Sequence, residues 1–165
     1  MKRILVTGSG GIGGVNFVRA LKIFQDEFFI VGTDFNKYYL QFADLDQRVI
    51  SPKHSDPNFI SLLNKLTEQH KIEFLHPQPS SEALVVSQNL DKISSKTLLP
   101  SSNIISNDKL ETQKILSTSG IAVAKTKTID NYDLIASAFD ELGGGPLWIR
   151  AKNGAGGNLS LLCDN

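Results

Sequence analysis

The sequence opens on a short apolar segment that runs directly into a glycine-rich turn. Residues 4–7 read ILVT, and residues 7–14 read TGSGGIGG, with five glycines in eight positions. A continuous apolar run that stops at glycine is typical of a strand buried on both faces. Residues 15–24 then carry apolar side chains at helical spacing. The pattern predicts a strand, a tight turn and a helix.

This alternation recurs four times, with connections long enough for parallel pairing. Further strands are predicted at residues 28–33, 48–50 and 72–75. One helix is expected to begin at Asp56, with Pro57 in its first turn, and the next at Ser80 or Ser81 as N-cap. Since parallel crossovers are right-handed, we predict a Rossmann-like open parallel sheet with helices on both faces over residues 1–104.

The pattern changes after about residue 100, and a second domain is expected over residues 105–165. Helices are predicted at residues 108–118 and 132–142, a half-exposed strand at 123–129, and a hairpin of strands at 147–150 and 159–163. The sequence ends just after this hairpin. The second region therefore reads as the truncated start of an α+β subdomain.

Composition excludes several classes of function. Lysine plus arginine and aspartate plus glutamate both number 17, so no overall charge favours nucleic acid or a membrane surface. Cys163 is the only cysteine, which rules out an internal disulfide. No signal-peptide core or membrane-spanning run is evident, and a cytoplasmic protein is expected.

The opening glycines fit the dinucleotide fingerprint G-x-G-x-x-G at Gly8, Gly10 and Gly13, with Asp34 about 20 residues later as a candidate ribose ligand. The same glycines would also let the first helix pack closely on its sheet, with Asp34 as a cap. A short-chain dehydrogenase further needs a lysine four residues after its tyrosine. No tyrosine of this sequence has one, which argues against that chemistry.

A second glycine-rich segment, residues 146–157, reads PLWIRAKNGAGG. A cation at a strand end followed by pliant glycines suits the binding of a polyphosphate. No Gly-Lys-Ser/Thr follows, so the segment is not a Walker loop. An ordinary hairpin with a solvated basic residue would explain the segment as well.

The whole chain resembles the ATP-grasp superfamily, specifically ligases similar to the large subunit of carbamoyl-phosphate synthase. The resemblance rests on ILVTGSGGIGGVNFVRALK, IVGTDFNKYYLQFAD, DPNFISLLNKLTEQHKIEFLHPQPSSEAL, SNDKLETQKILSTSGIAVAKT and PLWIRAKNGAGG. It implies a Rossmann-like pre-ATP-grasp domain that shapes the acceptor side of a cleft, followed by the start of an ATP-grasp domain.

The resemblance also implies roles for individual residues. ATP phosphates would be contacted by Lys109 and Arg150 and covered by Gly154, Gly156 and Gly157, while Gly10, Gly11 and Glu82 would lie on the substrate side. The sequence departs from the family pattern at Ala151, where proline is common. Leu159-Ser160 also replaces the usual Gly-Val, and both changes put the phosphate affinity in doubt.

Such enzymes use ATP and Mg²⁺ to convert a carboxylate into an acylphosphate, which an amine, or sometimes a thiol, then attacks. The resemblance puts the Mg²⁺ ligands outside this chain, so the remainder of the ligase is expected in cis or as a separate subunit. A stand-alone remnant used for binding is the other explanation of the truncation. A non-catalytic NAD(P)-binding module, a scaffold that binds neither nucleotide, and a homo-oligomer stay open as alternatives.

Overall fold

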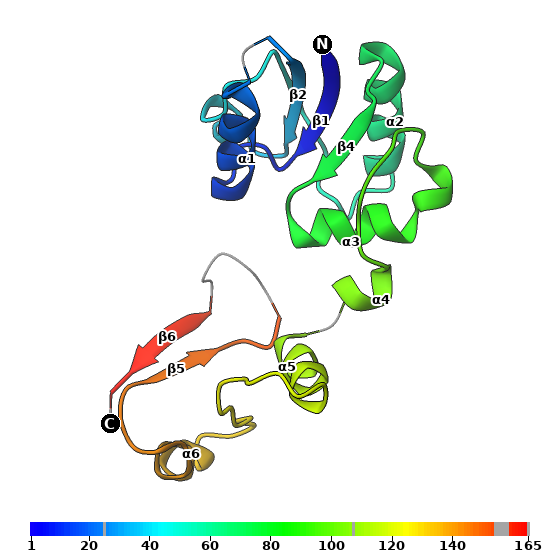
Figure 1. The fold of residues 1–165 in the computed structure, drawn as a ribbon. Coiled ribbons are helices and arrows are strands. Elements are labelled where there is room, and N and C mark those ends of the chain that lie inside the picture. The colour runs from blue at the N-terminus through cyan, green and yellow to red at the C-terminus, as the bar shows by residue number, and fades with distance from the viewer. Residues whose placement is uncertain (25, 107, 154–158, 165) are drawn as a thin grey trace. The chain divides into compact units, whose positions relative to one another are not determined.

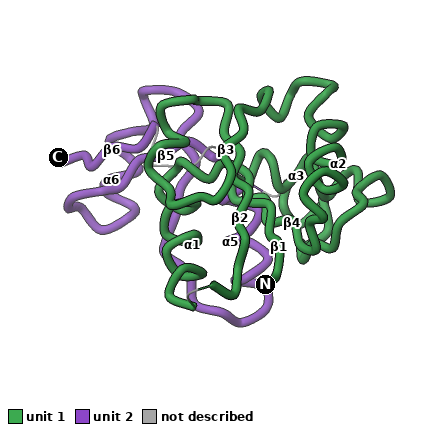
Figure 2. The backbone as a smooth tube through the Cα atoms, turned by 90° about the horizontal axis from the view of Figure 1, so that it is seen from above, with its two compact units in different colours: residues 1–106 green, residues 107–165 purple. Residues whose placement is uncertain are grey.

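The computed structural model describes residues 1–24, 26–106, 108–153 and 159–164. The chain forms two compact units, residues 1–106 and 107–165, which Figure 2 draws in different colours. The units are described separately below. Among the described residues, no helix has the length and apolar character needed to cross a bilayer.

The first unit is built on a four-stranded sheet with every neighbouring pair parallel. Its strands are β1 (Lys2–Thr7), β2 (Phe28–Asp34), β3 (Gln47–Ile50) and β4 (Phe74–Pro77), in the spatial order β3-β2-β1-β4. The main helices are α1 (Ile12–Lys22), α2 (Phe59–His70) and α3 (Ser80–Gln88). Figure 1 shows α1 on one side of the sheet and α2 and α3 on the other. The predicted Rossmann-like fold is thereby confirmed.

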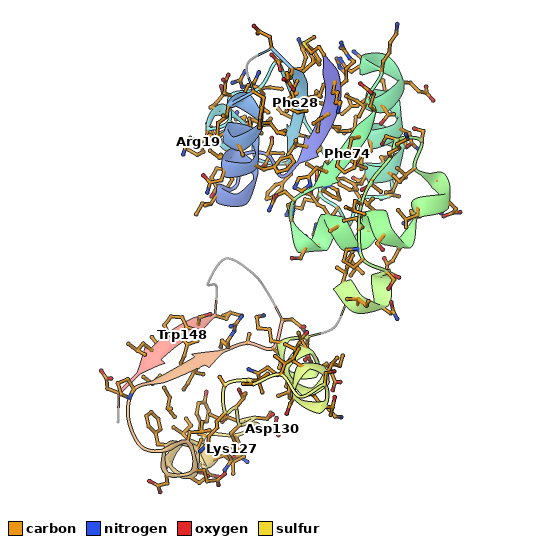
Figure 3. All side chains as sticks on the ribbon, viewed as in Figure 1. Arg19, Phe28, Phe74, Lys127, Asp130 and Trp148 are labelled. Atoms are coloured by element: carbon orange, nitrogen blue, oxygen red, sulfur yellow. The ribbon has the colours of Figure 1, made fainter. Side chains whose placement is uncertain are left out.

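Two apolar layers hold this sheet between its helices. On the α1 face, Ile4 and Val6 of β1 pack in one cluster with Val15 and Val18. Phe28 and Phe74, both labelled in Figure 3, pack against the same cluster from β2 and β4. On the opposite face, Leu5, Val31, Phe59, Leu63, Leu75 and Val86 form the second cluster. Since successive side chains of a strand point to opposite faces, one strand contributes to both layers.

The predicted N-caps of two helices are wrong by one or two residues. The first turn of α2 follows Asn58, whose backbone N–H donates to the Asp56 carboxylate over 2.8 Å. Asp56 therefore organises the turn before the helix. For α3, Pro79 is the N-cap with φ −70° and ψ 137°, and both serines lie inside the first turn. The proline ring fixes φ at Pro79, and its extended ψ angle places this residue just before the first helical residue, Ser80.

Short elements complete the first unit. These are the 3-10 helices η1 (Tyr39–Gln41) and η2 (Leu90–Lys92) and the helix α4 (Ser102–Ile105). Lys96 forms an isolated parallel bridge with Phe74 on the outer edge of β4.

The second unit combines two helices with an antiparallel hairpin. Its elements are α5 (Lys109–Thr118), α6 (Leu134–Leu142), β5 (Leu147–Arg150) and β6 (Ser160–Cys163). The α5 N-cap is Asp108, whose carboxylate accepts the Glu111 N–H over 2.8 Å. At the end of α6, Gly143 adopts φ 106°, a left-handed conformation that favours glycine. The antiparallel pairing of β5 with β6 confirms the predicted hairpin.

The predicted strand at residues 123–129 is wrong, because the structure has no strand there. Instead, the Lys127 ammonium group binds the Glu141 carboxylate and the Ser137 hydroxyl of α6. Figure 3 shows Lys127 beside that helix. The alternating apolar pattern thus belongs to a segment that packs on a helix without a neighbouring strand.

Candidate functional site

The carboxyl ends of the parallel strands form the edge at which ligands bind in open α/β sheets. Thr7 ends β1, and the register sets it opposite Thr33 of β2 and Pro77 of β4. The glycine loop follows Thr7 directly, and the first turn of α3 follows β4 within three residues. Strand register therefore brings together three segments that are far apart in the sequence.

The protein itself fills most of the space around the glycine loop. A Cβ atom added at Gly8, where φ is 56°, would overlap the Pro79 ring, and one at Gly10 would overlap the Tyr39 backbone. Gly11 differs, because its added Cβ would meet only the Gly8 carbonyl oxygen, at 3.5 Å. Of the two glycines predicted to face a substrate, Gly11 has room for an added methyl group in ordinary van der Waals contact, and Gly10 does not.

Asp34 ties the glycine loop to the next loop. Its carboxylate accepts the Gly10 N–H through Oδ2 over 3.2 Å and the Asn36 N–H through Oδ1 over 2.9 Å. The side chain is only 4% exposed. Because both oxygens already accept backbone donors, this acid has a structural role.

Three buried polar atoms gather next to the glycine loop, and among the described residues their nearest polar neighbours are one another, with the Thr7 hydroxyl facing the Glu82 carboxyl group. They are Thr7 Oγ1, Thr33 Oγ1 and Glu82 Oε2. Both threonines are fully buried and Glu82 is 4% exposed. Glu82 Oε2 would lie 3.7 Å from a Cβ atom at Gly8, so the carboxyl group reaches the glycine loop from α3. Buried polar groups normally find partners, which makes this cluster a candidate ligand site.

The pKa of the Glu82 carboxyl group is raised above its ordinary value, chiefly because burial disfavours the charged form. A hydrogen bond donated by the Thr7 hydroxyl favours the ionised form and partly offsets this effect, while the negative charge of Asp34 adds to it. Glu82 stands in the first turn of α3, whose N-cap residue Pro79 has no side-chain group that could cap the helix. The carboxyl group is directed to the strand ends.

The sequence analysis named Glu82 as a candidate but not the two threonines. Their signal was available, since each is a polar residue near the end of an otherwise apolar strand. Their proximity, however, depends on strand register.

His76 and Gln78 brace the other side of the loop. The His76 ring stacks on Phe17 of α1 with centroids 3.8 Å apart, and its Nε2 lies 2.8 Å from Gln78 Oε1. Gln78 Nε2 would in turn meet a Cβ atom at Gly13 at 2.5 Å. These contacts hold the β4–α3 connection against the start of α1.

In the second unit, Lys109 lies beside the exit of β5. Its backbone N–H and its ammonium group both donate to the Lys152 carbonyl, over 3.3 Å and 3.0 Å. Arg150, the last residue of β5, is two positions earlier and exposed. The two predicted phosphate contacts therefore belong to neighbouring segments of one unit. Gly154, Gly156 and Gly157 lie outside the described residues.

The described residues do not fit a site for the Mg²⁺ ion that the resemblance implies. Within residues 1–24, 26–106, 108–153 and 159–164, no three side chains of His, Cys, Asp or Glu gather to hold a metal ion.

Comparison with solved structures identifies the fold as that of the N-terminal portion of ATP-grasp enzymes. N5-carboxyaminoimidazole synthetase from Staphylococcus aureus, complexed with ADP, matches 99% of this chain with 18% identity and a TM-score of 0.67. The biotin carboxylase domain of Hydrogenobacter thermophilus 2-oxoglutarate carboxylase, complexed with MgADP, ADP and bicarbonate, matches 99% of it with 17% identity and a TM-score of 0.61. Glycinamide-RNase-transformylase T from Mycobacterium tuberculosis matches 99% with 12% identity and a TM-score of 0.58.

The chain spans less than half of each of these proteins, namely 42%, 38% and 44% of their lengths. No family model matches the sequence. No curated protein matches it either. The likeness is therefore one of fold, carried by structure at low sequence identity.

Proposed function

We propose that this chain is the N-terminal portion of an ATP-dependent ligase that activates a carboxylate as an acylphosphate and joins it to an amine. The buried polar cluster of Thr7 Oγ1, Thr33 Oγ1 and Glu82 Oε2 beside the glycine loop is the observation that carries the acceptor half of this proposal. The likeness in fold to proteins solved with ADP supports the nucleotide half.

The chemistry of the cluster suits an amine. The two hydroxyls and the carboxyl group can each accept a hydrogen bond, and a protonated primary amine has three N–H donors. A cation beside Glu82 would also offset the repulsion between its ionised form and Asp34. Binding of the amine would thus favour ionisation of Glu82. The Gly11 backbone, which has room for an added methyl group, would border this acceptor site.

On the nucleotide side, Lys109 and Arg150 are proposed to contact ATP phosphates, with Gly154, Gly156 and Gly157 covering them. Cations that neutralise phosphate oxygens are the main requirement of phosphoryl transfer besides the metal. The Mg²⁺ ligands and the remaining catalytic groups are proposed to come from the rest of the ligase, in cis or as a separate subunit.

The hairpin of the second unit supports the need for a further part. Trp148 on β5 is 59% exposed, and Leu161 and Leu162 on β6 are 64% and 55% exposed. Figure 3 labels Trp148 on this hairpin. A two-stranded sheet is marginally stable by itself, and exposed apolar side chains on both strands suit coverage by additional sheet.

Equilibrium dialysis of the chain against MgATP and, separately, against NADPH tests the nucleotide half. We expect MgATP binding that Lys109→Ala and Arg150→Ala each weaken by about tenfold, since each removes a charge-assisted contact. Lys114→Ala, which removes an exposed cation from the same helix α5, is the matched control. NADPH binding that Asp34→Ala abolishes would instead favour the NAD(P)-binding module, and no binding of either nucleotide would favour the scaffold.

Titration with ethylamine, monitored by NMR of the threonine methyl groups, tests the acceptor half separately. We expect the Thr7 and Thr33 signals to shift with ethylammonium and not with ethanol. Glu82→Gln should abolish the shift, whereas Glu68→Gln, at an exposed position of α2, should leave it unchanged. Equal responses to the amine and the alcohol would contradict an amine site.

A further inference from the structure

The first unit carries a pocket between α2 and α3 that shares no lining residue with the cluster at the glycine loop. Its volume is about 510 Å³, which lies in the range of sites that bind small molecules. The walls come from three parts of the chain: the segment before α2, the first two turns of α2, and the end of α3 with the η2 turn that follows. The pocket is therefore a second candidate ligand site in this unit.

One part of the wall is apolar. Pro57 lies at the entry to α2, Ile60 in its first turn, and Val85 on α3. Ile60 and Val85 are half-buried and pack against the core cluster on this face of the sheet. Their remaining exposed surface suits contact with an apolar group of a ligand.

A lysine lines the pocket in a position that its neighbours hold. The Lys92 ammonium group donates to Asn89 Oδ1 over 2.9 Å, and Asn89 Nδ2 donates to the Val85 carbonyl over 2.9 Å. The Lys92 carbonyl accepts a hydrogen bond from Asn64 Nδ2 over 2.6 Å. An ammonium group has three N–H donors, so two of them stay available to a ligand. A carboxylate would complement them.

An acid lines the same pocket. Asp56 Oδ1 accepts the Asn58 N–H and its side-chain amide over 2.8 Å and 3.0 Å, whereas Asp56 Oδ2 has no hydrogen-bond partner among the described residues. Over the same residues, Asp56 and Lys92 form no ion pair with each other or with any other side chain. His54 lies beside them, and a neutral imidazole can both donate and accept a hydrogen bond. Two opposite charges thus line one pocket without neutralising each other.

We propose that this pocket binds a small amino acid with an apolar side chain. The Lys92 ammonium group binds the carboxylate of the ligand, the Asp56 carboxylate binds its ammonium group, and Ile60 and Val85 contact its side chain. A ligand with a carboxylate alone would add negative charge near Asp56, and one with an amine alone would add positive charge near Lys92. The two charges of the pocket therefore select a ligand that carries both.

Titration with L-leucine, monitored by NMR of the Ile60 and Val85 methyl groups, tests this site. We expect both signals to shift, with a dissociation constant on the order of millimolar. Isocaproate lacks the amino group of leucine, and isoamylamine lacks its carboxylate. Each should bind at least about tenfold more weakly than leucine, because each loses one charge-assisted contact.

Two variants remove one charge of the pocket at a time. Lys92→Met keeps most of the aliphatic chain, and Asp56→Asn keeps an acceptor oxygen for Asn58. Each should weaken leucine binding at least about tenfold, and in Lys92→Met leucine should bind no better than isoamylamine. Lys65→Met and Glu68→Gln are the matched controls, because both positions are exposed on α2 and neither lines the pocket. Circular dichroism should show that all four variants fold.

Glu82→Gln separates this pocket from the proposed acceptor site. It should abolish the amine-induced shifts of the two threonines and leave the leucine-induced shifts of the pocket methyl groups unchanged. Pocket signals that do not move with leucine would overturn the proposal. Equal binding of leucine and isocaproate, or leucine binding that survives Lys92→Met, would overturn it too.

Discussion

The buried carboxyl group of Glu82 lies close enough to Asp34 for the charge of Asp34 to raise the pKa of Glu82. The two acids have different surroundings. Asp34 accepts two backbone N–H groups, whereas the Glu82 carboxyl group accepts no backbone donor and has only the Thr7 hydroxyl beside it. One carboxyl group therefore maintains the loop, and the other is available to a ligand.

The raised pKa of Glu82 predicts a specific dependence of stability on pH. Because the folded state favours the protonated form, ionisation of Glu82 costs stability as the pH rises from the ordinary value of a glutamate through the folded pKa. Glu82→Gln should remove this loss, so the difference in melting temperature between variant and unmodified chain should grow with pH. Thermal melts from about pH 4 to about pH 8 measure it. A difference that stays constant would contradict the burial argument; Glu68→Gln is the control.

Removal of the Asp34 carboxylate should destabilise the first unit. Asp34→Ala leaves the Gly10 and Asn36 N–H groups without their acceptor, and bonds to charged groups contribute about 1.5–3 kcal/mol. Urea unfolding should show a loss of that order, whereas Asp44→Ala at an exposed position should change the free energy of unfolding by less than about 0.5 kcal/mol. If Asp34→Ala left stability unchanged, the structural role of this acid would be refuted.

The two neighbouring glycines of the loop should respond differently to alanine. At Gly10 the new methyl group would overlap the Tyr39 backbone, and forced repacking of this kind costs about 1–3 kcal/mol. At Gly11 the added atom meets only an oxygen at 3.5 Å, and its φ of −72° suits any residue. The cost there should stay below about 0.5 kcal/mol. Chemical denaturation of the pair compares them directly, and equal losses would count against the packing described.

Arg48 should not tolerate replacement by lysine. Its planar guanidinium serves three carbonyls at once, and a lysine ammonium lacks that geometry. We expect Arg48→Lys to lower the free energy of unfolding by about 1–3 kcal/mol and to increase hydrogen exchange in residues 38–46. Arg19→Lys, on an exposed position of α1, provides the comparison. Unchanged exchange in the loop would disprove the anchoring role.

The parallel sheet could be predicted from the sequence because continuous apolar runs such as residues 4–6 are typical of strands that are buried on both faces. The sequence was insufficient where neighbours decide the conformation. The alternating pattern of residues 123–129 suits a strand, but Lys127 binds α6 through Glu141 and Ser137. Likewise Pro79, and neither of the two serines that follow it, sets the start of α3.

The candidate site was only partly predictable for a similar reason. Glu82 was singled out through resemblance, while its burial depends on the start of α3 lying against the glycine loop, where the Pro79 ring adjoins Gly8. Thr7 and Thr33 are 26 positions apart and become neighbours only through the parallel register of β1 and β2. Short-range patterns carry no information about such register, so these hydroxyls were missed.

The hydrogen bond between the Asp34 carboxylate and the Gly10 amide preorganises the glycine loop for ligand binding. Because this hydrogen bond lies within the protein, the glycine loop keeps the same conformation with and without a ligand beside it. Any molecule that enters beside Gly11 would meet a rim already in its final shape, and would lose little affinity to reorganising the protein.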